Sequence, residues 1–87
     1  MNAIVTVIGE DRVGIIAAVC NLLAECGVNV LDLNQTILHG AFTMVMAVDV
    51  GTAEIGMVRE KLEGLGKEMG MSMRIQREEI FDAMYRI

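Results

Sequence analysis

The apolar residues of this chain change their spacing along the sequence, and this change limits the folds open to the chain. Two stretches repeat their apolar residues at helical spacing, residues 13–25 and the segment from Gly51 to Met69. Four stretches have the length and composition of β-strands, namely residues 2–8, 28–38, 41–50 and 71–77. The order β-α-β-β-α-β predicts an α+β, ferredoxin-like βαββαβ fold, with a four-stranded antiparallel sheet and two helices on one face.

Local signals predict where the helices begin and end. Asp11 or Arg12 stands at the expected N-cap of the first helix, and Gly27 stands at its C′ position. The second helix is expected to open at Gly51, with Thr52 as its N-cap. Two glycines near its end, at positions 64 and 66, each weaken a helix by roughly 1 kcal/mol relative to alanine, so we expect fraying or an early end.

The strands carry signals of their own. Residues 2–8 are apolar on both faces, which predicts a central strand. His39 and Gly40 predict a tight hairpin turn between the second and third strands. Strict alternation puts one face of the second strand at Asn29, Leu31, Leu33, Gln35 and Ile37, and the other at Val30, Asp32, Asn34, Thr36 and Leu38. The sheet face away from the helices has no predicted cover, so the tail or another subunit is expected to hide Val45 and Ala47.

The length and the apolar content of the chain predict one small domain that associates with another chain. Eighty-seven residues suit a single domain over residues 1–87, with a core at 2–77 and a C-terminal docking tail at 79–87, a short amphipathic helix. The hydrophobic fraction of 54% leaves glycine out and still exceeds the globular average of about 45–50%, which includes it. The excess predicts apolar surface buried against a second copy, that is, a homodimer.

Charge and motif content disfavour several classes of function. A net charge of −5 argues against nucleic acid as a partner. No uninterrupted apolar run reaches membrane-spanning length, and no signal peptide is recognisable, so we expect a cytoplasmic protein without a membrane partner. Cys20 and Cys26 lie six residues apart on the first helix, which suits neither a disulfide nor a metal pair, and we expect buried thiols. With one histidine and no Cys–His pair, we expect no metal, no cofactor and no enzyme activity.

The segment Gly9-Glu10-Asp11-Arg12-Val13-Gly14 joins a strand to a helix and is the main candidate site. Such a junction offers free backbone N–H groups and the positive end of a helix dipole, which favour a carboxylate or a phosphate. Taken alone, the same residues favour an ordinary start of a helix over a ligand site, and both alternatives stay open.

The sequence GEDRVGII, followed by GVNV at residues 27–30, resembles the ACT domain, a small-molecule regulatory module. The resemblance covers residues 2 to about 77 and extends to free-standing ACT proteins and to one half of the glycine cleavage system's transcriptional regulator. It implies edge-to-edge pairing through the second strand and the first helix, with an amino acid bound at that interface. The candidate ligand-binding residues are Asp11, Arg12, Val13, Gly14, Ile15 and Asn29. Asn29 is expected to lie beside the first loop.

These features favour a non-catalytic regulatory module that binds an amino acid at a homodimer interface and acts on a regulated protein that the sequence does not identify. The alternative is a pure protein–protein interaction or dimerisation module without a ligand. An enzyme is the least favoured class.

Overall fold

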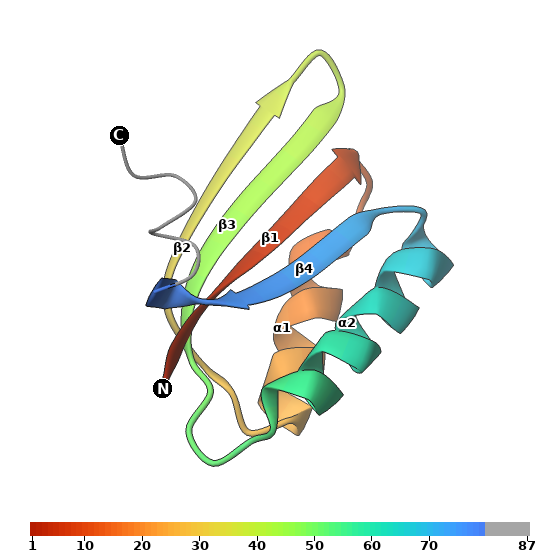
Figure 1. The fold of residues 1–87 in the computed structure, drawn as a ribbon. Coiled ribbons are helices and arrows are strands. Elements are labelled where there is room, and N and C mark those ends of the chain that lie inside the picture. The colour runs from red at the N-terminus through yellow and green to blue at the C-terminus, as the bar shows by residue number, and fades with distance from the viewer. Residues whose placement is uncertain (80–87) are drawn as a thin grey trace.

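The strands and helices follow one another in the predicted order (Figure 1). The computed structural model describes residues 1–79, so the helix expected in the tail lies outside the described residues. The elements are β1 (Asn2–Glu10), α1 (Ile15–Glu25), β2 (Asn29–Leu38), β3 (Ala41–Asp49), α2 (Ile55–Met69) and β4 (Ser72–Arg77). They form an antiparallel sheet in the order β2-β3-β1-β4, so the βαββαβ prediction is confirmed.

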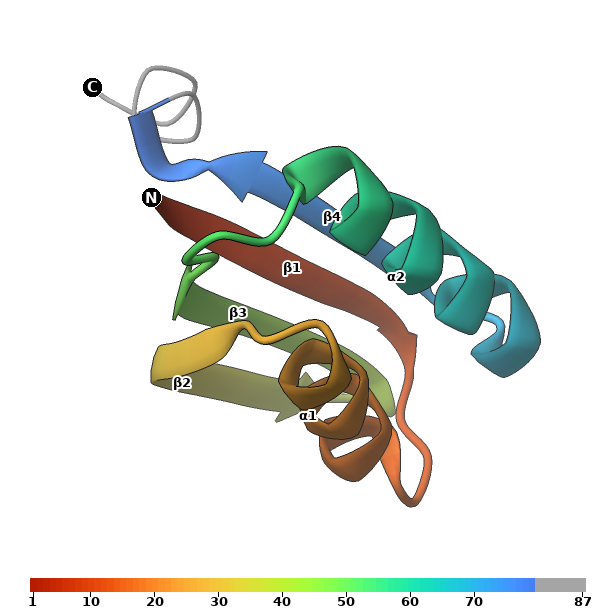
Figure 2. The same ribbon diagram turned by 90° about the horizontal axis from the view of Figure 1, so that it is seen from below.

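Both helices lie on the same side of the sheet (Figure 2). β1 is central, between β3 and β4, as predicted. The buried side chains alternate along the strands and face the helices. They include Val5 and Val7 of β1 and Met44 and Met46 of β3. Leu23 of α1 and Leu62 of α2 are buried on the helix side of the same core. Flexible methionines thus occupy much of the space that aromatic residues fill in other cores.

Neither α1 nor α2 covers the opposite side of the sheet, and we call this side, as the described residues 1–79 form it, the open face. The register brings residues of all four strands to it, and twelve of them form its central part. They are Asp32, Asn34 and Thr36 of β2, Thr43, Val45 and Ala47 of β3, Ile4, Thr6 and Ile8 of β1, and Ser72, Arg74 and Gln76 of β4. The second face of β1 is therefore only partly buried, and half of the Ile8 side chain is exposed (50%).

The helix starts differ from the prediction. α1 begins at Ile15 after Gly14, whose φ of 90° is left-handed, and no side chain caps it, so the assignment of Asp11 or Arg12 as N-cap is wrong. The backbone N–H of Asp11 instead donates to the Gly40 carbonyl at 2.8 Å, which ties this residue to the β2–β3 hairpin. For α2, the N-cap is Glu54 and not Thr52, because the chain makes a further turn before the helix.

The helix ends confirm one prediction and contradict another. Gly27 has a left-handed φ of 76° and follows Cys26, the C-cap residue of α1, as expected for a C′ glycine. α2, however, continues through Gly64 and Gly66 to Met69, so the expected fraying is not observed. The Gly66 carbonyl accepts the N–H of Met71 at 2.8 Å, and this contact joins the helix to the chain that enters β4.

A β-bulge changes the face assignment at the start of β2. Val30 pairs with Val48 and Asp32 pairs with Ala47, so Leu31 is an extra residue. Val30 therefore lies on the helix side, together with Leu33, and the strict alternation predicted for this strand is wrong at that point. The hairpin prediction is confirmed, since both turn residues have positive φ, 51° at His39 and 79° at Gly40.

Candidate functional site

A pocket of about 370 Å³ lies where the β1–α1 loop meets the end of β2. Its walls come from the loop, the first turn of α1 and the hairpin end of the sheet. The lining residues are Asp11, Arg12, Gly14, Ile15, Ile16, Ala17, Gln35, Ile37 and Phe42. The floor is apolar and the rim is polar, which is the usual arrangement of a small-molecule site.

Two contacts hold the loop in place. The N–H of Asp11 bonds to the Gly40 carbonyl at 2.8 Å. The Arg12 guanidinium donates through Nη1 to the Met69 carbonyl, also at 2.8 Å. That carbonyl belongs to the last turn of α2, where carbonyl groups lack helical partners and a cation is favourable. Arg12 therefore connects the loop to the end of α2.

The start of α1 offers hydrogen-bond donors to the pocket. The Gly14 carbonyl accepts the N–H of Ala18 at 2.9 Å, so the N–H groups of Ile15, Ile16 and Ala17 precede the first helical hydrogen bond. Among residues 1–79, no side chain caps this turn and no acidic residue lies in it. These amides and the helix dipole favour an anionic group at the pocket.

The predicted site residues do not all meet. Asp11, Arg12, Gly14 and Ile15 line the pocket, whereas the fully exposed Val13 lies in the loop and does not line it.

The expected proximity of Asn29 to the loop is wrong within one chain. Asn29 pairs with Asp49, which pairs with Asn2, whereas the loop follows Glu10 at the other end of β1. Eight residue steps of about 3.4 Å separate the two ends, or roughly 27 Å. α1 runs back along the sheet, so the strand that follows it begins far from the loop that precedes it.

Sequence reasoning missed the contribution of the sheet to this pocket. Gln35 and Ile37 of β2 and Phe42 of β3 supply one wall. The signal was present, because the turn at His39–Gly40 sets the register of the hairpin and Gln35 and Ile37 share a face of β2. What was lacking was the pairing of β1 with β3, which brings the hairpin end beside the loop.

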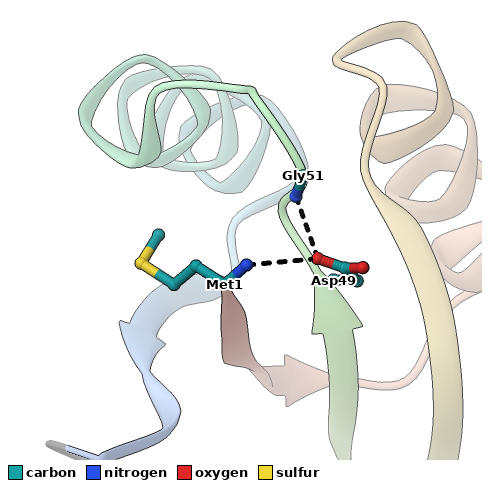
Figure 3. A network of polar contacts seen from close by, with 3 residues as sticks. All are labelled: Met1, Asp49 and Gly51. Carbon is teal, nitrogen blue, oxygen red and sulfur yellow. Dashed lines mark hydrogen bonds and ion pairs between the residues drawn. The ribbon is translucent and has the colours of Figure 1, made fainter.

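The other end of the sheet carries a polar network (Figure 3). The Asp49 Oδ1 atom accepts the Gly51 N–H at 3.0 Å and lies 3.4 Å from the Met1 ammonium. The hydrogen bond from Gly51, followed by the contact with the ammonium group, lowers the pKa of Asp49 below its usual value of 3.8.

Three further features of the described residues bear on function. Within residues 1–79, no group of three His, Cys, Asp or Glu side chains is placed to hold a metal ion. No helix in this part of the chain has the length and apolar character needed to span a membrane. Cys20 and Cys26 are free thiols and are half-buried, not buried as expected.

The fold and the loop define a small ferredoxin-like module of the kind found in regulatory proteins. The family model described as "ACT domain" matches residues 2–76, and the chain therefore belongs to the ACT domain family. It is 48% identical to a UPF0237 protein of Listeria innocua, with all of both chains covered. It is 44% identical to a UPF0237 protein of Methanopyrus kandleri, with 99% of this chain and 98% of the relative covered.

Solved structures agree with this assignment. An ACT domain protein from Streptococcus pneumoniae superposes with a TM-score of 0.82 at 38% identity, covering 98% of both chains. A structure described as a glycine cleavage system transcriptional repressor gives 0.78 at 25% identity, covering 86% of this chain and 44% of that one. The regulatory subunit of aspartate kinase from Thermus thermophilus gives 0.69 at 28% identity, covering 86% and 50%.

Proposed function

We propose that this protein is a non-catalytic regulatory module that binds an amino acid in the loop pocket, at the interface of a homodimer. The observation that carries the proposal is the pocket itself, in which the uncapped first turn of α1 faces the end of β2. Membership of the ACT family and the likeness to the regulatory subunit of aspartate kinase support it. The expected location is the cytoplasm, and the regulated partner is a protein.

The chemistry of the pocket suits a zwitterion. The N–H groups of Ile15 and Ile16 and the helix dipole attract a carboxylate. Asp11 lies on the same rim and supplies a carboxylate for an ammonium group. Gln35 adds an amide that both donates and accepts hydrogen bonds. Amino acids carry an anionic and a cationic group on one carbon, so they match this pair of charges.

A homodimer would also account for Asn29. β2 lies at the edge of the sheet, and its outer side is unpaired within the described residues. If two copies pair antiparallel along this edge, the start of one β2 strand lies opposite the end of the other. Asn29 of the partner subunit then lies at the pocket end of β2, although Asn29 of the same chain lies about 27 Å away.

The test is a thermal-shift screen of the twenty amino acids against the wild-type chain. A ligand at 100 times its dissociation constant adds about 2.7 kcal/mol to the free energy of unfolding, which raises Tm measurably. We expect at least one amino acid to raise Tm, and Asp11→Asn or Asn29→Ala to remove most of that shift. Glu60→Gln is the matched control, because its side chain is exposed on α2, outside the pocket.

The absence of any shift in the wild-type chain would contradict ligand binding. A shift in Tm that remains in both Asp11→Asn and Asn29→Ala would contradict the assigned site. It would still show that the protein binds an amino acid.

One observation favours a second candidate, a pure interaction module. β2 exposes about half or more of Leu31, Ile37 and Leu38 (52%, 53% and 65%). Apolar residues on an unpaired edge strand are typical of a surface that pairs with another chain. This candidate predicts association without any response to amino acids, so the same screen separates the two functions.

A further inference from the structure

The open face differs from an ordinary solvated sheet face. Apolar Ile4, Ile8 and Val45 lie on its middle strands. Two of its charged residues lie on opposite edge strands, Asp32 on β2 and Arg74 on β4, whereas Glu10 and Asp49 lie at opposite ends of the middle strands. We propose that the open face is a self-association surface, on which a second copy of this chain stacks its own open face. This interface is separate from the loop pocket and from the β2 edge, and it does not rest on the proposed function.

The shape of the face is complementary to itself. A hollow of about 450 Å³ lies over β2 and β3, where Ala47 and Thr43 are small, and Ile4 of β1 forms one of its walls. Beside it, β1 carries the larger Ile4 and Ile8, and the register aligns Ile4 with Ala47 and Ile8 with Thr43 across the strands. At each of these two positions along the strands, β3 therefore carries a small side chain and β1 carries a large one.

A two-fold axis parallel to the strands brings these small and large side chains together. The sheet order is β2-β3-β1-β4, so this axis places β1 of each copy over β3 of the other, and β4 over β2. Ile4 then lies over Ala47 of the partner subunit, and Ile8 over Thr43 of the partner subunit. Packed sheets lie about 10 Å apart, a spacing that such large-over-small pairs fill.

The charges select this orientation. With the axis parallel to the strands, Arg74 of each copy lies near Asp32 of the partner subunit, one alternate position along the strand, or about 7 Å. Neither residue has an ion-pair partner among residues 1–79, although Asp32 accepts the Leu33 N–H at 2.9 Å. An axis perpendicular to the strands would instead place β4 over β4 and β2 over β2, so Arg74 would not meet Asp32 of the partner subunit and the opposite charges would stay unpaired.

Charge reversal tests the pairing directly. The full-length chain, Asp32→Arg and Arg74→Asp are each examined by sedimentation velocity over a range of concentrations, and then the two variants are mixed in equal amounts. We expect each reversal alone to weaken association at least tenfold, because it places like charges at both symmetric contacts. In the mixture, one contact joins Arg at position 32 of one variant to Asp at position 74 of the other, and the second contact keeps the native pair of Arg74 and Asp32, so association returns.

The controls are Glu60→Arg and Lys61→Asp, exposed charge reversals on α2 that are expected to associate as the wild type does. The proposal is overturned by a wild-type chain that lacks this association, by single variants that keep it, or by controls that lose it. It is also overturned when the mixture fails to recover, which is the result expected if the chain's own C-terminal tail covers the face.

Discussion

Asp49 shows how one carboxylate joins three parts of the chain. It ends β3, accepts a hydrogen bond from Gly51 in the following turn, and lies beside the Met1 ammonium that precedes β1 (Figure 3). Both contacts favour the ionised form of the carboxyl group, so its pKa is lower in the folded chain than in the unfolded chain. The network lies at the end of the sheet away from the loop pocket.

The contacts of Asp49 with Gly51 and Met1 predict how the stability of the fold depends on pH. Because the folded-state pKa of Asp49 is lowered from 3.8, its stabilising contribution is full above that value and is lost as the pH falls through the folded pKa. We expect Asp49→Asn to be less stable than the wild type at pH 7, with the difference shrinking in acid. Denaturation by urea between pH 2 and pH 7 measures it.

Glu60→Gln is the control, since it removes the same charge from an exposed position on α2. A difference between Asp49→Asn and the wild type that stays constant with pH would contradict the assignment.

Arg12 illustrates a residue whose role depends on a distant partner. From the sequence, Arg12 is a candidate helix cap or a candidate ligand-binding residue. In the structure its guanidinium bonds to the Met69 carbonyl, a residue 57 positions away. The contact joins the loop to the last turn of α2. Arg12 therefore acts on the site by holding the loop in position.

Among the elements, α2 depends on a glycine that its own helix propensity disfavours. Gly66 is buried, and a Cβ atom at this position would lie 2.5 Å from the Met71 carbonyl oxygen. The chain leaving α2 returns directly over this residue, so only a missing side chain permits the close approach. Gly64, on the same helix, has no atom within 4 Å of the corresponding position.

The two glycines predict opposite effects of the same substitution. Gly66→Ala is expected to destabilise the fold by about 1–3 kcal/mol, because a backbone oxygen must move. Gly64→Ala is expected to stabilise it by up to about 1 kcal/mol, because it removes the conformational entropy of a glycine without a clash. Urea denaturation at pH 7 measures both. Equal effects of the two variants would show that helix propensity alone governs α2.

β2 is the element least covered by the rest of the chain. Most of its residues are exposed, and only Val30 and Leu33 pack against the core. The bulge at Leu31 places both of these apolar residues toward the helices, and it leaves Leu31 itself 52% exposed. β2 therefore stays paired with β3 on both sides of the bulge, and it still exposes apolar side chains.

For the whole molecule, this unpaired edge predicts a dimer by extension of the sheet. Ile37→Lys puts a charge on the exposed apolar edge beside the pocket, and a buried charge without a partner is unfavourable. We expect the variant to weaken edge pairing at least tenfold in a light-scattering dilution series.

Met57→Lys serves as the matched control, because Met57 is also exposed and apolar (43%) but lies on α2. Loss of association in both variants, or in neither, would contradict pairing through β2. The result is independent of the open face, because Ile37 lies on the helix side of the sheet.

Local sequence determined the elements of this protein. Helical spacing marked α1 and α2, alternation marked the buried face of β3, and two residues with positive φ closed the hairpin at His39–Gly40. These features depend on side chains a few positions apart, and the sequence contains all of that information. The order of the elements then limits the topology, because a βαββαβ chain has few ways to cover one sheet with two helices.

Only the tertiary structure decided the features that depend on contacts between residues distant in the sequence. The bulge at Leu31, the passage of α2 through Gly66 and the bond from Arg12 to Met69 each depend on a strand or a turn far away in the sequence. The site followed the same rule, since the pairing of β1 with β3 brought Gln35 and Phe42 to the loop and placed Asn29 at the opposite end of the sheet. Strand register is a long-range property, and local residue patterns carry no direct record of it.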